Sequence, residues 1–209
     1  GIKYKGALVY VNDFEGKITK FNLTNMENDG AGKNIKLYDS TILLNIKADR
    51  INGRYQYHSM DAGIGRTSQN FWMFSGTGDY ERLTSKDTKI DNLMFGFRDK
   101  DYPLFRKYDD PVTIRHGFEK CMDTTGDTLG VKCPLTTKDV SRIARSKKNL
   151  GWYIKLTDRK KVVAEPTLSN NIVYYPIYKP TSINNLSCGS GDAYICAADA
   201  ECGTNISSR

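Results

Sequence analysis

Five cysteines are the residues of this chain best suited to covalent or metal chemistry. They are Cys121, Cys133, Cys188, Cys196 and Cys202. No Cys-x-x-Cys pair occurs, and the two histidines, His58 and His116, lie far from the cysteines in the sequence, so no zinc site is expected. We therefore expect disulfides, which form in an oxidising location such as the periplasm, the cell surface or the extracellular space.

The spacing of the cysteines favours one pairing and leaves another open. Cys121 and Cys133 bracket the turn-rich loop MDTTGDTLGVK, so we expect a disulfide between them, which the chain-entropy model values at about 3 kcal/mol. Two of the other three cysteines are expected to pair, with Cys188 and Cys202 as candidates. The one left over is either a free buried thiol or is joined to a cysteine elsewhere.

Carboxylates in the same loop are the candidates for a calcium site. Asp123 and Asp127 offer oxygen ligands, but the loop lacks the alternating ligands and the terminal bidentate Glu of an EF-hand. We interpret both residues as solvated turn carboxylates. No metal site is therefore predicted.

Motifs for nucleotide binding and for catalysis do not occur. Gly76-Thr77-Gly78 lacks the third glycine and following helix of a dinucleotide fingerprint and the lysine of a phosphate loop, so it predicts a turn at a strand end. There is no Gly-x-Ser-x-Gly elbow, and neither histidine has a carboxylate pattern that would make it a base. We expect no catalytic residue and no bound cofactor.

Aromatic residues on the predicted strands offer a stacking surface for a sugar or a peptide, although such residues more often pack in a core. The set comprises Trp72, Trp152, Tyr153, Tyr174, Tyr175 and Tyr178. We interpret them as core packing. His58 is expected on a strand face and His116 in a loop.

Composition narrows the class of protein. The 209 residues are 39% hydrophobic and 26% charged, and no apolar run approaches the roughly 20 residues that span a bilayer. The net charge of +7 is spread along the chain, so we interpret the lysine-rich stretches at 141–148 and 158–163 as solvated faces and expect no nucleic-acid partner. The opening GIKYKGALVY is not a signal peptide and lacks an initiator methionine, which is typical of an interior or processed piece.

The elements that position these residues are predicted to be strands. Alternating residues predict strands at 7–12 and 17–23, joined by the corner Asp13-Phe14-Glu15-Gly16, where Gly accepts a positive φ. The nearly continuous apolar run at 70–80 predicts a strand buried on both faces, with 92–99 as its partner. Further strands are expected at 35–48, 54–60, 151–156, 160–168, 170–180 and 191–199, although 40–48 also fits a helical pattern.

Prolines and polar stretches mark the limits of these strands. Pro166 and Pro176 each lack a ladder donor and belong at strand ends, edges or bulges, and 61–66 is expected to turn. Residues 100–149 are rich in Asp, Lys, Pro and Gly and predict an insertion, which holds the cysteine loop and one short helix at 136–148.

The resulting order predicts an all-β fold of antiparallel strands with one disulfide-bearing loop and helix insertion. Barrel, sandwich and propeller all fit this order. A repeated pattern of apolar strand, Gly-containing connection and second strand favours the blades of a propeller. It gives about two and a half to three blades, whereas closed propellers have about four to eight, so we expect other parts of a longer protein to complete the ring.

Three segments, in this order, resemble the PilC/PilY family of type IV pilus tip-associated proteins. They are ALVYVNDFEGKITKFNL, FWMFSGTGDYERLTSKDTKIDNLMFGFRD and the stretch from GWYIKL to DAYICAAD. The resemblance covers most of residues 6–99 and 150–199. It implies that 1–209 is part of a modified C-terminal β-propeller whose N-terminal partner region is missing.

The resemblance also has departures from the family pattern. Relatives often carry an Asp-rich calcium loop before the first hairpin, whereas the stretch GIKYKGA has no carboxylate, so calcium is not expected there. Asp79 stands where relatives often have Arg or Lys. No Arg-Gly-Asp tripeptide occurs.

The function implied by the resemblance is support of pilus assembly, surface adhesion and twitching motility, at the pilus tip or cell surface. The implied partners are minor pilins, a host or abiotic surface, and the rest of the full-length chain. One alternative is a quinoprotein-like propeller dehydrogenase, which needs adjacent cysteines and repeated docking tryptophans, whereas this chain has two Trp and no adjacent cysteines. A second alternative is a scaffold in an outer-membrane assembly. The identity of the partner that co-purifies with the protein would distinguish this alternative.

Overall fold

The structure is a computed structural model that describes residues 7–23, 39–48, 53–79, 92–113, 150–181, 191–204 and 206. These residues form three four-stranded sheets joined by turns and extended segments, with no helix among them. No membrane-spanning helix is therefore found in the described part of the chain. The all-β prediction is confirmed for these residues.

The N-terminal sheet has the order β1-β2-β3-β7, from strands β1 (Leu8–Asn12), β2 (Lys17–Asn22), β3 (Ser40–Asn45) and β7 (Val112–Thr113). β1 and β2 form the predicted antiparallel hairpin. Its corner closes as expected, because Gly16 takes a φ of 77° and donates its N–H to the Asp13 carbonyl at 3.0 Å. The short β7 pairs with β3 in parallel, which differs from the all-antiparallel prediction.

The central sheet has the order β4-β5-β6-β8, from strands β4 (Asp61–Ile64), β5 (Phe71–Gly76), β6 (Leu93–Asp99) and β8 (Gly151–Lys155). All neighbours are antiparallel. Every residue of β6 and five of the six in β5 are buried. The prediction of a strand buried on both faces, paired with 92–99, is confirmed.

The C-terminal sheet is built around the nine-residue β11 (Ile172–Pro180). β12 (Gly191–Asp199) pairs along its whole length, while β9 (Lys161–Val162) and β10 (Thr167–Ser169) pair with different parts of β11. The single strand predicted at 160–168 is thus two short strands, and Pro166 directly precedes the second. Pro176 lies between the residues of β11 that pair with β10 and those that pair with β9, a position compatible with its missing N–H.

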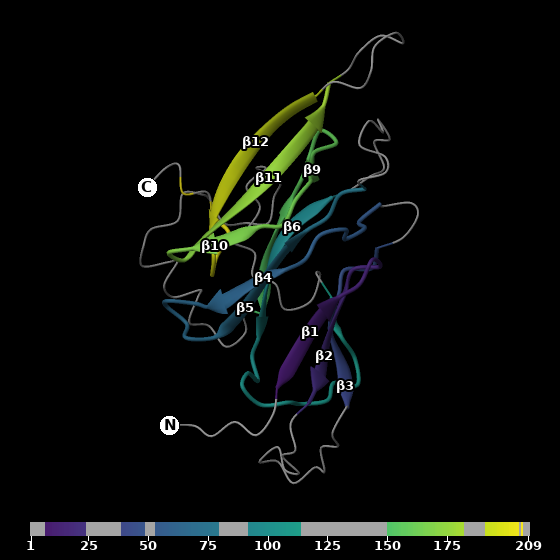
Figure 1. The fold of residues 1–209 in the computed structure, drawn as a ribbon, viewed down its shortest axis with the longest axis vertical. Helices are drawn as coiled ribbons and strands as arrows, with labels where there is room; N and C mark the ends of the chain where they lie inside the picture. The colour runs from purple at the N-terminus through teal and green to yellow at the C-terminus, as the bar shows by residue number, and fades with distance from the viewer. Residues whose placement is uncertain are drawn as a thin grey trace.

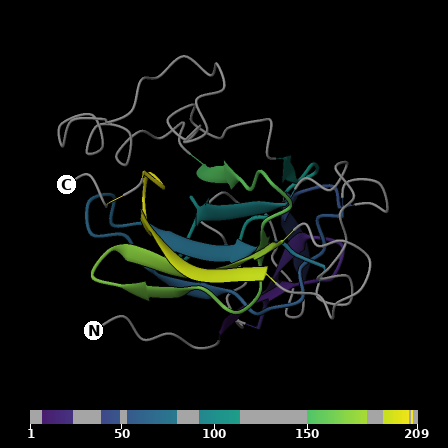
Figure 2. The ribbon, with the colours of Figure 1, turned by 90° about the horizontal axis from the view of Figure 1, so that it is seen from above.

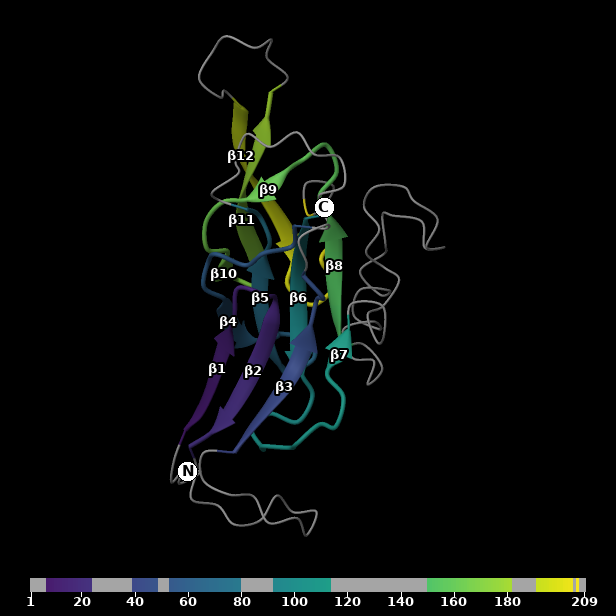
Figure 3. The same ribbon diagram turned by 90° about the vertical axis from the view of Figure 1, so that its right-hand side faces the viewer.

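The three sheets stack so that the central sheet is covered on both faces, as Figures 1 and 3 show and as Figure 2 shows from above. One core lies between the central and N-terminal sheets and contains Ile18, Leu44, Met73, Phe95 and Phe97. The other lies between the central and C-terminal sheets and contains Trp72, Phe74, Trp152, Val173 and Ile177. This stack of four-stranded sheets is a propeller-like fragment.

Two boundaries predicted from the sequence are wrong. Residues 54–60 form no strand, and the strand lies at 61–64, where a turn was predicted. The turn comes later, closed by the Gly65 N–H donating to the Asn70 carbonyl at 2.8 Å, because Asp61–Ile64 finds a partner in β5.

The predicted insertion also begins too early. Phe105 is buried, the Tyr108 N–H donates to the Thr41 hydroxyl at 2.9 Å, and β7 joins the N-terminal sheet. Residues 100–113 therefore belong to the fold. The predicted helix at 136–148 and the loop between Cys121 and Cys133 lie outside the described residues.

Candidate functional site

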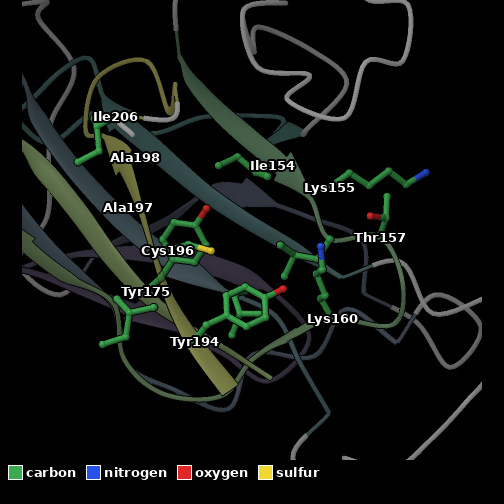
Figure 4. A pocket seen from close by; sticks show the side chains of 13 residues that line it. Ile154, Lys155, Thr157, Lys160, Tyr175, Tyr194, Cys196, Ala197, Ala198 and Ile206 are labelled. Carbon is green, nitrogen blue, oxygen red and sulfur yellow. The ribbon is translucent and has the colours of Figure 1, made fainter. Parts of the chain in front are cut away.

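A cavity opens between β8 and β12, two strands that lie at the edges of their sheets. Its volume is about 830 Å³, and Figure 4 shows its side chains in close view. It continues outward from the core between the central and C-terminal sheets, because Ile154, Tyr175 and Ile177 belong to both. A volume of this size is typical of pockets that hold small molecules.

The β11–β12 ladder sets which side chains reach this cavity. Tyr175 is opposite Cys196 and Ile177 is opposite Tyr194, so these four side chains lie on one face of the sheet. The opposite wall comes from β8 and the turn that follows it, where Lys160 lies. The cavity lining therefore combines aliphatic side chains with hydroxyl, thiol and ammonium groups.

The polar groups of the cavity influence each other's protonation. A hydrogen bond joins the Tyr175 hydroxyl to the Cys196 thiol. Burial raises the pKa of the Cys196 thiol, and the positive charge of Lys160 and the Tyr175 hydrogen bond only partly oppose that rise. Burial, assisted by Cys196, likewise raises the pKa of Tyr175. The thiol is thus neutral at physiological pH, which makes it a poor nucleophile.

A second polar group lies between the N-terminal and central sheets. The Lys20 ammonium forms an ion pair with the Asp99 carboxylate at 2.6 Å, and both side chains are almost completely buried. Tyr10 donates its hydroxyl hydrogen to the same carboxylate at 2.8 Å, and Lys20 also donates to the Leu104 carbonyl at 2.5 Å. Burial and the nearby Asp99 charge raise the pKa of Tyr10. These bonds fix one sheet against the next.

A third polar group joins the central and C-terminal sheets. The buried Glu201 carboxylate accepts hydrogen bonds from the Thr67 N–H at 2.8 Å and the Ser68 N–H at 2.6 Å. Burial lowers the pKa of the Arg98 guanidinium, and the Glu201 charge partly offsets this effect. Glu201 therefore holds the turn between β4 and β5 against the end of β12.

Gly76-Thr77-Gly78 lies where the central sheet meets β9. A Cβ on Gly76 would come within 2.3 Å of the Val162 side chain, so only glycine permits this close approach. Thr77 accepts a hydrogen bond from the Leu93 N–H at 2.8 Å, and the Val162 N–H donates to the Thr77 carbonyl at 3.1 Å. The motif is a joint between two sheets as well as the predicted strand end.

Most residues predicted to carry chemistry fall outside the described part of the chain: Cys121, Cys133, Cys188, Asp123, Asp127 and His116. Cys196 and Cys202, the two described cysteines, are not joined to each other. Cys202 is buried in the core, and Cys196 lines the cavity. The predicted disulfides and the calcium candidates stay untested, and no metal-binding group of His, Cys, Asp and Glu occurs among the described residues.

The aromatic residues divide between core and surface. Trp72 and Trp152 are fully buried and donate their indole N–H groups to the Ser68 hydroxyl at 3.0 Å and the Ala200 carbonyl at 2.7 Å. Their interpretation as core residues is confirmed. Tyr174 is 39% exposed, and His58 lies in the extended segment 53–60, where partial burial lowers its pKa.

Sequence reasoning missed the residues that join the sheets. Lys20 follows Ile18 by two positions in a strand, so period-two alternation places it on the same buried face. This alternation alone could have predicted that Lys20 is buried. Its partner Asp99 is distant in the sequence, as is Glu201 from the turn it binds. Such pairings depend on how the sheets stack, which the sequence pattern alone does not give.

Comparisons with known proteins give a structural relative. No protein-family model and no curated protein matches this sequence. The structure is similar to a solved structure, the C-terminal domain of PilY1 from Pseudomonas aeruginosa, with a TM-score of 0.56 and 11% sequence identity. The similarity covers 94% of this chain and 44% of that chain, so this chain spans less than half of its solved relative. At this low identity the match establishes the fold, and the chain therefore has a fold similar to part of the PilY1 C-terminal domain.

Proposed function

We propose that this chain is an interaction module of a type IV pilus-associated protein of the PilC/PilY kind, acting without catalysis. The observation that carries the proposal is the match of fold with the PilY1 C-terminal domain over 94% of the chain. It is independent of the sequence motifs, which led to the same family.

The three family-like segments support the proposal because they coincide with the sheets. The first forms the β1–β2 hairpin, the second supplies β5 and β6 with the Gly76-Thr77-Gly78 joint, and the third runs from β8 to β12. Each sheet thus holds at least part of one of these segments, and the central sheet holds parts of two. A resemblance spread in this way over all three sheets argues for common architecture rather than one shared turn.

The mechanism that we propose is geometric. A central sheet with both faces buried, joined to its neighbours by Lys20 with Asp99 and by Glu201, makes a rigid support. Loops and edge strands of that support would contact minor pilins or a host or abiotic surface. The protein would act at the pilus tip or cell surface, where the oxidising environment would permit a Cys121–Cys133 disulfide.

A deletion in the full-length protein tests this function. Removing residues 7–204 in the bacterium that makes the protein is expected to reduce the number of surface pili, adhesion and twitching motility. A matched variant, Lys17→Gln, changes one exposed ion pair with Glu15 and should leave all three unchanged. Unaltered piliation, adhesion and motility in a deletion strain with a stable truncated protein would refute the proposal.

A further inference from the structure

The cavity between β8 and β12 has an apolar interior. Ile154, Leu156 and Ile177 come from the adjoining core, and Ala198 and Ile206 extend the aliphatic surface. Water in contact with such walls is displaced favourably by an aliphatic group, at about 25 cal/mol per Å² of apolar surface removed from water. The interior of the cavity therefore suits a hydrocarbon chain.

The charged side chains that line the same cavity are all basic. Two lysines, Lys155 and Lys160, line it, and none of its lining residues is acidic. Within the described part of the chain, no carboxylate forms an ion pair with the Lys160 ammonium. In Figure 4 the side chains of Lys160 and Tyr194 lie on the same side of the cavity, so an ammonium and a hydroxyl are available together.

We propose that this cavity binds an aliphatic carboxylate, with the hydrocarbon chain against the isoleucines and the carboxylate beside Lys160 and Tyr194. A carboxylate complements the Lys160 ammonium, which has no ion-pair partner among the described residues, and accepts hydrogen bonds from both the ammonium and the hydroxyl. A cationic amphiphile of the same length would bury the same chain but would meet the lysine charge. Ligand binding in this cavity is separate from the proposed pilus role, so either can fail without the other.

Decanoate, at concentrations below those at which it forms micelles, is the probe. Calorimetric titration into the 209-residue chain is expected to show saturable binding at one site. Lys160→Gln should weaken binding by about fivefold or more, the effect of losing one partly exposed ion pair with its hydrogen bond. Lys179→Gln is the matched control, since Lys179 pairs with Asp158 outside the cavity, and should bind like the parent chain.

Cys196 gives a second readout inside the same cavity. Alkylation of this neutral thiol by N-ethylmaleimide is expected to be slow, and its rate, followed over hours by mass spectrometry of the peptide that contains it, should fall further as decanoate saturates the site. Decyltrimethylammonium at the same concentration should leave the rate unchanged. Circular dichroism of each variant verifies that it is folded before its binding is interpreted.

Three results would overturn the proposal. They are binding that does not saturate, equal affinity for the cationic amphiphile, and an unchanged affinity in a folded Lys160→Gln variant. Full reactivity of Cys196 in the presence of saturating decanoate would equally place the ligand elsewhere.

Discussion

Buried charges at the contact between the N-terminal and central sheets stand out at the scale of single residues. Lys20 and Asp99 leave water almost completely, which carries a desolvation cost of several kcal/mol for each ion. The structure offsets that cost with their mutual attraction and with hydrogen bonds from Tyr10 and to the Leu104 carbonyl. A buried pair of this kind adds little net stability, and we expect it to specify how the two sheets meet; removing one partner is the damaging change, because it leaves an uncompensated buried charge.

Lys20→Met therefore tests the pair. Methionine keeps most of the lysine volume but leaves the Asp99 carboxylate buried without its cation, and we expect the free energy of unfolding to fall by about 3 kcal/mol. Urea denaturation measures this free energy. The double variant Lys20→Met with Asp99→Asn should regain part of the loss, while the exposed Lys17→Gln should change stability by no more than about 0.5 kcal/mol. A loss below about 1 kcal/mol for Lys20→Met would contradict the buried pair.

The stability of the protein at alkaline pH tests the raised pKa of Tyr10. Its pKa in the folded protein is raised by burial and by Asp99, while in the unfolded chain a tyrosine titrates near pH 10. Above that pH the unfolded state loses the proton that the folded state keeps, so stability is intact below pH 10 and falls as pH rises beyond it. Tyr10→Phe should make that fall shallower by up to about 1.4 kcal/mol per pH unit. Tyr174→Phe removes an exposed hydroxyl as the control, and identical slopes for Tyr10→Phe and the parent chain would refute the assignment.

At the scale of elements, the sequence predicts the most buried strands best. The apolar run at 70–80 has no polar alternation, and that is the expected pattern for β5, whose two faces pack against different cores. The β1–β2 hairpin was also predictable, because its corner carries its own turn chemistry at Asp13 and Gly16. Local features thus determined the elements that were predicted correctly.

Elements that depend on distant partners were predicted poorly. Residues 54–60 alternate like a strand, yet their backbone bonds go elsewhere, with the Gln56 N–H donating to the Phe14 carbonyl and the Tyr55 carbonyl accepting from Gly78. The cavity was missed for the same reason, since its two walls come from different sheets. Neither the partners of a segment nor the gap between two sheets is encoded in local periodicity.

Close packing around Gly96 leads us to predict that a larger residue at this position lowers the stability of the fold. A Cβ at this position of β6 would lie 2.5 Å from the Trp152 Nε1 atom and 3.0 Å from a Phe74 ring carbon. Gly96→Ala should therefore destabilise the fold by about 1–3 kcal/mol through overpacking, as measured by denaturant unfolding. Val11→Thr, at a 45% exposed position in β1, should stay within about 0.5 kcal/mol. Equal stability of Gly96→Ala and the parent chain would show that this packing is looser than described.

At the scale of the whole molecule, the cysteines report the compartment in which the chain folds. If the chain is secreted as proposed, we expect the protein collected outside its cells and alkylated without prior reduction to carry the label on Cys196 and to yield a linked peptide containing Cys121 and Cys133. The expected label on Cys196 rests on its free thiol, which lines the cavity, and the expected bridge rests on the loop that the other two cysteines bracket. Labelling of both Cys121 and Cys133 would contradict the predicted disulfide.

The proposed function is that of a module that works outside the cell on a pilus. Immunogold labelling of the epitope-tagged full-length protein on sheared and intact pili tests this most directly. The account predicts gold particles at pilus ends and at the cell surface, lost when residues 7–204 are removed. Label confined to the cytoplasm, with pili unmarked in cells that express the intact protein, would contradict it.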